Sequence, residues 1–122
     1  MNYRRHKLWT LLECLFVLTL LLTSADAATW TVGPSSGPGI DYTSIQTAIN
    51  AATTGDTILV KSGTYNEDVN VNKALTLRGV GIPVVNASSS VGAIILSANG
   101  CTLEGFKVSN SFSGNAGIRV TS

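Results

Sequence analysis

The strongest constraint on the fold of this chain is a repeat of short apolar segments in its second half. Residues 75–80 (LTLRGV) match residues 101–106 (CTLEGF), and residues 94–96 (IIL) match residues 118–120 (IRV). Both pairs of segments are offset by nearly the same length of chain, in the mid-twenties. A period of this length that contains several short β-favouring segments is typical of a solenoid.

The segments predict an all-β fold built from strands of about three residues, separated by Gly, Asn and Ser. Leucine-rich repeats have a similar length, but their fixed Asn and Leu positions are missing here. A right-handed parallel β-helix fits better, with one coil per period and coils stacked about 4.8 Å apart. The predicted strands are residues 58–60, 69–71, 75–77, 84–85, 94–96, 101–103, 106–108 and 118–120.

The same period assigns equivalent positions to further residues. Gly79 and Gly105 hold the same place in successive coils, and we expect a bend with positive φ at each of them. Ile58 and Val84 are separated by the same length of chain as these glycines, which predicts that they occupy one position in successive coils.

An amphipathic helix is predicted just before the first coil. Residues 29–32 alternate like a short strand, and the Gly- and Pro-rich residues 33–39 form a loop. The period then changes, which indicates a short helix over residues 42–52 that Asp41, Thr43 or Ser44 can cap. Because the first coil of a solenoid exposes unpaired strand edges, we expect this helix to cover it. The apolar face of the helix consists of Ile45, Ala48, Ile49 and Ala52.

The N-terminus has the three parts of a secretory signal peptide. A basic segment (residues 4–7) precedes an apolar core (residues 8–22), and an A-D-A site ends at Ala27. The competing interpretation is an uncleaved anchor, but the apolar run is shorter than the roughly 20 residues that span a membrane. We therefore predict a signal peptide (1–27), an N-terminal strand, loop and capping helix (28–56), and the first, incomplete coils of the β-helix (57–122).

Signal cleavage would remove several chemistries from the chain. His6 and Met1 are the only histidine and methionine, and Cys101 would be the only remaining cysteine. No disulfide, Ser-His-Asp arrangement, zinc site or copper site is therefore expected, and no catalytic, cofactor-binding or metal-ligating residue is assigned. Basic and acidic residues would remain in equal number, so no basic patch for nucleic acid is predicted.

Five charged residues have both a functional and a structural interpretation. Glu67 and Asp68 could form an acid–base pair or a calcium site, but adjacent residues of an extended segment point in opposite directions, which favours a solvated turn. Arg78 and Glu104 occupy matching positions one coil apart, and a salt bridge worth under about 1 kcal/mol is favoured over a lyase-type base and its partner. Asp56 is interpreted as a turn residue before the first strand.

The remaining candidates are uncharged. Cys101 aligns with the inward-pointing Leu75, so a buried small hydrophobic residue is favoured over a reactive thiol. The aromatic residues could stack on sugars, but they are scattered, and packing in the core or cap is favoured. Asn86 begins a glycosylation sequon that matters only in a host that glycosylates exported proteins. The aromatic residues concerned are Trp30, Tyr42 and Tyr65.

The residues just described resemble the N-terminal region of pectin-lyase-like β-helix proteins. The resemblance is carried by residues 41–52, 55–60, 63–65 and 75–79, together with Glu67 and Val69. Pectin methylesterases, polysaccharide lyases, epimerases, NosD-type periplasmic proteins and microbial surface proteins share this opening. In the enzymes of this superfamily the catalytic residues lie on later coils, so none is carried over to this chain.

Two functions follow as expectations. The first is an exported, non-catalytic scaffold of a surface, adhesion or binding protein, which the low charge and the Ser-, Thr- and Asn-rich exterior favour. The second is the N-terminal part of a polysaccharide lyase or pectin esterase, an enzyme assignment that rests on the resemblance alone. The expected location is secreted, periplasmic or at the cell surface, with no membrane span after cleavage. The expected partner is an extended polysaccharide or a cell-surface component, and the incomplete solenoid is expected to associate end to end.

Overall fold

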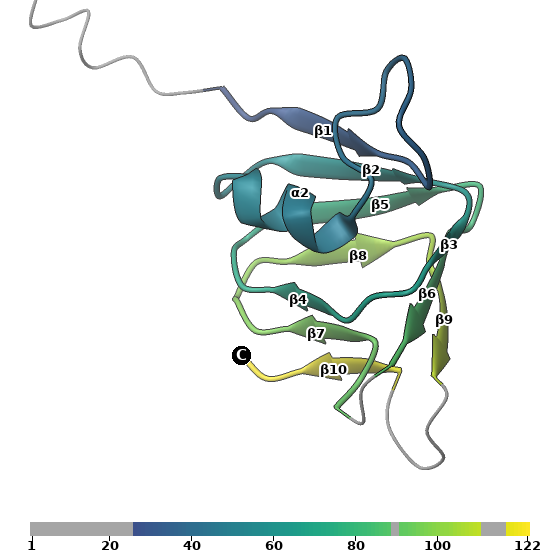
Figure 1. Ribbon diagram of the computed structural model, residues 1–122. Helices are drawn as coiled ribbons and strands as arrows, with labels where there is room; N and C mark the ends of the chain where they lie inside the picture. The colour runs from purple at the N-terminus through teal and green to yellow at the C-terminus, as the bar shows by residue number, and fades with distance from the viewer. Residues whose placement is uncertain (1–25, 89–90, 111–116) are drawn as a thin grey trace, which may run out of the picture.

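The structure is a computed structural model that describes residues 26–88, 91–110 and 117–122, and it forms a parallel β-solenoid of about three turns (Figure 1). The three parallel sheets have the strand orders β1-β2-β5-β8, β3-β6-β9 and β4-β7-β10. The prediction of an all-β parallel β-helix with one short helix near its start is therefore confirmed. The elements are β1 (Thr29–Val32), α2 (Ile45–Ala51), β2 (Thr57–Lys61), β3 (Thr64–Tyr65), β4 (Val69–Val71), β5 (Thr76–Val80), β6 (Val84–Ala87), β7 (Ile94–Leu96), β8 (Thr102–Glu104), β9 (Lys107–Asn110) and β10 (Ile118–Val120).

The strand register confirms the repeat in the second half of the chain and corrects its first period. Leu77 pairs with Leu103, and Ile94 pairs with Ile118, as the matching segments predict. Ile58, however, pairs with Leu77 and not with Val84, so the first coil is shorter than the coil that follows it. The prediction for Ile58 was wrong because it assumed coils of constant length.

The difference in coil length lies mainly in one connection. Tyr65 and Val85 are register partners, as are Val69 and Ile94. Four steps separate Tyr65 from Val69, whereas nine steps separate Val85 from Ile94. The strands stack regularly while the connection between β6 and β7 takes up the extra residues, because solenoid insertions are tolerated in loops.

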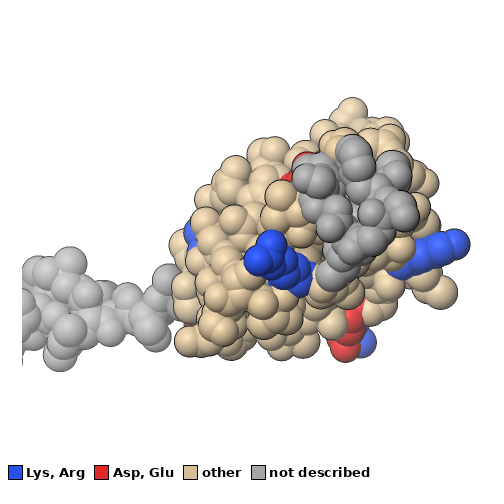
Figure 2. Space-filling model, turned by 90° about the horizontal axis from the view of Figure 1, so that it is seen from below, with Lys and Arg blue, Asp and Glu red and all other residues tan. Residues whose placement is uncertain are grey.

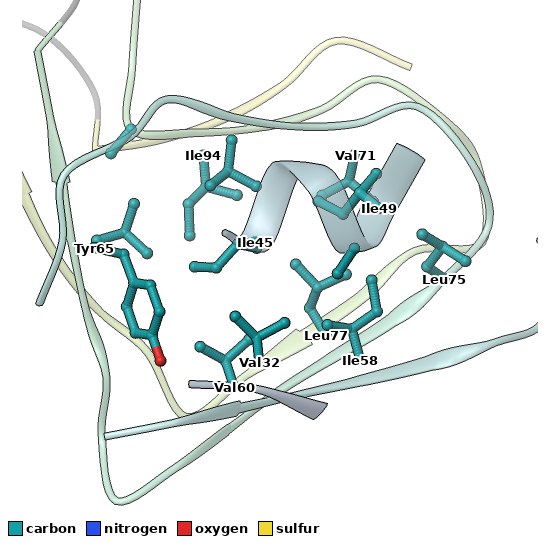
Figure 3. Packing of buried hydrophobic residues seen from close by; sticks show 14 of the residues in the cluster. Val32, Ile45, Ile49, Ile58, Val60, Tyr65, Val71, Leu75, Leu77 and Ile94 are labelled. Carbon is teal, nitrogen blue, oxygen red and sulfur yellow. The ribbon is translucent and has the colours of Figure 1, made fainter. Parts of the chain in front are cut away.

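The core lies inside the coils, and α2 covers its first end (Figure 3). Ile45 and Ile49 project from α2 into the interior, where both are fully buried. Full burial of each such side chain is worth about 1.5–3 kcal/mol relative to an exposed one. Residues around them come from all three sheets, which is why the helix can close the interior. The buried side chains labelled from the coils and β1 are Val32, Ile58, Val60, Tyr65, Val71, Leu75, Leu77 and Ile94.

The two equivalent glycines have different roles. Gly105 has φ of 77°, which confirms the expected left-handed bend there. Gly79 is not among the residues with positive φ but lies within β5, paired with Val60. A Cβ built on Gly79 would overlap the carbonyl oxygen of Gly105, and one built on Gly105 would lie 2.7 Å from the carbonyl oxygen of Gly79. Gly79 is therefore needed for close approach between coils, and not for a turn.

Replacement of Gly79 by alanine should destabilise the solenoid, because the new methyl group meets backbone that cannot rotate away. We expect a loss of about 2 kcal/mol or more in the free energy of unfolding, measured by urea denaturation. Gly37→Ala is the matched control, since no atom lies within 4 Å of its Cβ position. The control should be neutral or slightly stabilising. Equal stability of the two variants would contradict the close approach of Gly79 and Gly105.

Candidate functional site

The capping helix is fixed at its N-terminus by Glu67, which follows β3. One oxygen of this carboxylate accepts a hydrogen bond from the Ile45 amide at 2.9 Å, and the other accepts from the Gln46 amide and the Ser44 hydroxyl, each at 2.9 Å. Ser44 is the N-cap, and its Oγ accepts from the Thr47 amide at 3.3 Å. Among the three cap candidates of the sequence, the structure thus selects Ser44.

The C-terminus of the same helix is fixed by Lys73, which lies after β4. Its Nζ donates to the carbonyl oxygens of Ile49, Asn50 and Ala52 at 2.9, 3.0 and 2.7 Å. A carboxylate at the N-terminus and an ammonium at the C-terminus both complement the helix dipole. The first coil therefore holds its own cap by both ends.

This arrangement corrects the interpretation of Glu67 as part of a solvated turn. Glu67 is half-buried and contacts the helix above the first coil, whereas the exposed Asp68 accepts from the Ser88 amide of the next coil at 3.2 Å. The two carboxylates thus bind opposite neighbours, as expected for adjacent extended residues. They do not form an acid–base pair.

Asp56 precedes β2 and is far more buried than a turn residue needs to be. Only 2% of it is exposed, and it is the one buried polar or charged residue in the described part of the chain. Its Oδ1 accepts from the Ala28 amide at 2.8 Å, while Oδ2 accepts from the Thr53 amide at 2.9 Å and from the Trp30 indole nitrogen at 3.0 Å. These contacts join β1 to the start of β2.

The hydrogen bonds stabilise the ionised form of Asp56. The backbone amide of Thr53 contributes most, followed by the amide of Ala28 and the indole of Trp30, and together they lower the pKa of the carboxyl to about 2 against the opposing effect of burial. Asp56 is therefore a buried charge that organises the N-terminal cap, which the sequence interpretation as a plain turn residue missed.

The outer face of the β1-β2-β5-β8 sheet carries a column of threonines. Thr29 pairs with Thr57, Thr57 with Thr76, and Thr76 with Thr102, so the four residues are in register across the sheet. The residue after each threonine points inward, and the threonines therefore face outward. The outer two are exposed and the inner two half-buried. This column is the most regular array of hydroxyl-bearing residues in the register of the described strands.

The predicted ion pair lies on the same face, two residues after the threonines of β5 and β8. Arg78 Nε and Glu104 Oε1 are 3.0 Å apart, with 62% and 51% of the side chains exposed. The ion pair itself was predicted, and such an exposed pair is worth under about 1 kcal/mol. The exposed Lys61, at the end of β2, adds one positive charge to the same face. On the face of the molecule shown in Figure 2, charged side chains are few and most of the surface is uncharged.

The three aromatic candidates pack within the protein, as predicted. The rings of Trp30 and Tyr42 form an edge-to-face contact with centroids 5.7 Å apart. Tyr65 is 4% exposed and donates to the Lys61 carbonyl at 2.7 Å. Burial raises the pKa of Tyr65, and the nearby charge of Glu67 raises it further.

Cys101 is less buried than predicted. It packs against the core but is only half-buried, because it precedes β8, the last strand of its sheet in the described chain. Its thiol contacts the carbonyl oxygens of Lys73 and Ala98 at 3.2 and 3.1 Å. The sequon residue Asn86 lies on β6, and its Nδ2 donates to Asn66 Oδ1 at 2.9 Å.

The described residues include no group of three or more His, Cys, Asp or Glu side chains that could hold a metal ion. A shallow hollow of about 310 Å³ lies between the loop after β1 and the start of α2. Its one acidic side chain, Asp41, accepts from the Thr31 amide at 2.8 Å and so serves the loop. The hollow is lined by Ser36, Ile40, Asp41, Tyr42, Thr43, Ser44 and Thr47.

The predicted signal peptide lies outside the described residues except for Asp26 and Ala27, both exposed. In the described part of the chain, no helix has the length and apolar character needed to cross a membrane.

The chain is similar to a cell surface glycoprotein of Methanothermus fervidus, with 43% identity over 68 residues. The similarity covers 53% of this chain but 12% of that relative, so the chain matches only a small part of the larger protein. No family model and no solved structure matches the chain.

Loss of either charge at the helix ends should loosen the cap. We expect Glu67→Gln and Lys73→Met each to lower the free energy of unfolding by about 1–2 kcal/mol, because charged hydrogen bonds to half-buried helix ends are lost. Thermal melting with far-ultraviolet circular dichroism measures the change. Lys61→Met, at an exposed position on β2, is the control and should stay within about 0.5 kcal/mol of the unchanged chain. A comparable loss in the control would contradict a specific role of Lys73.

The lowered pKa of Asp56 predicts an acid-sensitive fold. The contribution of its ionised form is fully present above the unfolded pKa near 3.8 and is lost as the pH falls towards the folded value of about 2. The free energy of unfolding should therefore decrease between pH 4 and 2, and Asp56→Asn should flatten this part of the profile. Urea denaturation across this range is the measurement, and an unchanged slope in the variant would contradict the assignment.

Proposed function

We propose that this chain is the helix-capped part of an exported β-solenoid that serves as a non-catalytic scaffold at the cell surface. The observation that carries the proposal is the threonine column on a sheet face that carries few charges. The similarity to a protein named cell surface glycoprotein supports the same location. Export itself is supported by the signal-like residues 1–27.

The outer face of the four-stranded sheet is the proposed contact surface. Parallel coils repeat a residue about every 4.8 Å along the solenoid axis, so the threonine hydroxyls form a linear array. An extended polysaccharide offers hydroxyl groups at regular intervals along its own axis. A linear array of hydroxyl donors and acceptors can therefore bind such a chain at several successive points.

The charge of this face favours a neutral polysaccharide over a polyuronide. Arg78 and Glu104 compensate each other, and Lys61, four residues along β2 from Thr57, leaves the face an excess of a single positive charge, which is little for a polyanion. Leu59, half-buried on the same face, offers apolar contact for the flat side of a sugar ring. Both properties differ from what a pectin-binding surface needs.

The assignment of this chain to a group of β-helix proteins is part of the proposal. The residues of the capping helix and first coils resemble pectin-lyase-like proteins, and among these the NosD-type and other surface β-helices fit a scaffold best. The enzymatic alternative, a lyase or esterase, has no supporting feature in the described residues. The scaffold is therefore the function that we favour.

Cell fractionation can test location and contact surface together. An epitope inserted at the exposed residue Gly37 should be labelled by antibody on intact cells of the source organism. The double variant Thr76→Val, Thr102→Val keeps side-chain shape but loses two hydroxyl groups, and should shift the protein severalfold from the envelope fraction to the medium. Thr47→Val, on the exposed side of α2, is the control and should stay with the envelope.

Two outcomes would contradict different parts of the proposal. Retention of the tagged protein inside the cell would overturn the surface location. Surface labelling with equal envelope binding of the double variant and the control would leave the location intact and overturn the threonine face as the contact surface.

A further inference from the structure

We propose that processing after Ala27 places the new α-ammonium group of Ala28 in an ion pair with Asp56, and that this pair fastens β1 to the first coil. The inference rests on the export part of the proposed function. It assigns a role to the mature N-terminus that goes beyond the removal of a signal peptide.

The distance between the two groups carries the inference. The backbone nitrogen of Ala28 already lies 2.8 Å from Asp56 Oδ1. Hydrolysis of the Ala27–Ala28 peptide bond by a host signal peptidase consumes one water molecule, leaves a carboxylate on Ala27 and leaves an amine on Ala28, which takes up a proton near neutral pH. The same nitrogen thus changes from a neutral amide into a cation without having to move towards its partner.

Asp56 has an environment that suits a cationic partner. It is 2% exposed, yet its hydrogen-bond donors among the described residues are neutral groups, namely the amides of Ala28 and Thr53, the Thr53 hydroxyl and the Trp30 indole. Buried carboxylates are normally paired with a cation or a metal ion. Since these donors include no lysine or arginine, the cation that matches Asp56 is the one that processing creates.

Other charges near this site do not replace the ammonium. Lys73 is a cationic side chain of the same cap, but its Nζ is bound to the carbonyl oxygens of Ile49, Asn50 and Ala52. The acidic side chain just upstream, Asp26, is exposed and would leave with the signal peptide. After processing, Asp56 would therefore be the carboxylate in direct contact with the N-terminus.

The position of the pair explains what it would do. β1 is the outermost strand of its sheet, and the Ala28 carbonyl accepts from the Thr57 amide at 2.9 Å at the start of the ladder with β2. A charge-assisted bond at this end would hold β1 in register at the point where a free chain end would otherwise fray. Processing would then complete the cap and not merely release the chain.

Competitive labelling of the processed protein tests the pair. The chain is expressed with residues 1–27, the exported product is sequenced from its N-terminus, and its α-amine is titrated with acetic anhydride followed by mass spectrometry. We expect a product that begins at Ala28 and whose α-amine has a pKa about one unit above the usual 7.7–8.0, which gives about sevenfold slower labelling near pH 7.5. The same chain in denaturant supplies the unshifted reference.

Three variants separate the ion pair from general effects on folding. Asp56→Asn should return the labelling rate to the reference, whereas Asp41→Asn should not, although Asp41 also accepts from a β1 amide. If Asp56→Asn does not fold, a glycine inserted between Ala27 and Ala28 keeps Asp56 and moves the charge away by one residue. Trp30 fluorescence reports whether each variant is folded.

The outcomes distinguish this inference from the export proposal. A product that begins at Ala28 with an unshifted α-amine, or a glycine-inserted chain with the same shift, would overturn the ion pair alone. An exported product that begins at another residue would also overturn the pair and leave export intact. A product that retains Met1 would overturn both.

Discussion

The closure of the first coil is the constraint on which the rest of this structure depends. A solenoid gains its stability from contacts between neighbouring coils, so its first coil has an apolar interior with no neighbour on one side. Here α2 covers that interior with Ile45 and Ile49, and the coil itself holds the helix through Glu67 and Lys73. A helix of seven residues is too short to be stable alone, so these tertiary contacts define it.

A second set of contacts extends the first sheet beyond the helix. β1 adds a rung to the sheet above β2, and Asp56 connects the two through Ala28, Trp30 and Thr53. In each set of contacts a carboxylate, Glu67 or Asp56, accepts hydrogen bonds from two backbone amides. These amides have no partner strand, so the carboxylates compensate the burial of their polar groups. The cap thus combines a polar frame with an apolar centre.

Much of the fold could be predicted because it depends on local patterns. Alternation of apolar residues identifies the strands, and their matching segments fix the later registers, such as Leu77 with Leu103. The predicted register of Ile58 was wrong because it used the length of the second coil, which the long connection between β6 and β7 extends. The composition of the strands gives no sign of that extension. The roles of Glu67 and Lys73 were also missed, since each contacts residues more than 20 positions away in sequence. The threonine column had a readable signal, a threonine before each of four inward apolar residues.

The division between interior and exterior shows how such a fold could serve the proposed scaffold function. The inward positions must stack similar apolar residues, because each coil forms the floor of the next. Residues at the outward positions do not need to be apolar or similar, yet the backbone gives them the same regular spacing. A single residue type repeated outward, as with Thr29, Thr57, Thr76 and Thr102, therefore becomes a linear array with no further structural cost. In the proposed function, binding to a repetitive partner would follow from repetition of the fold, and not from a pocket.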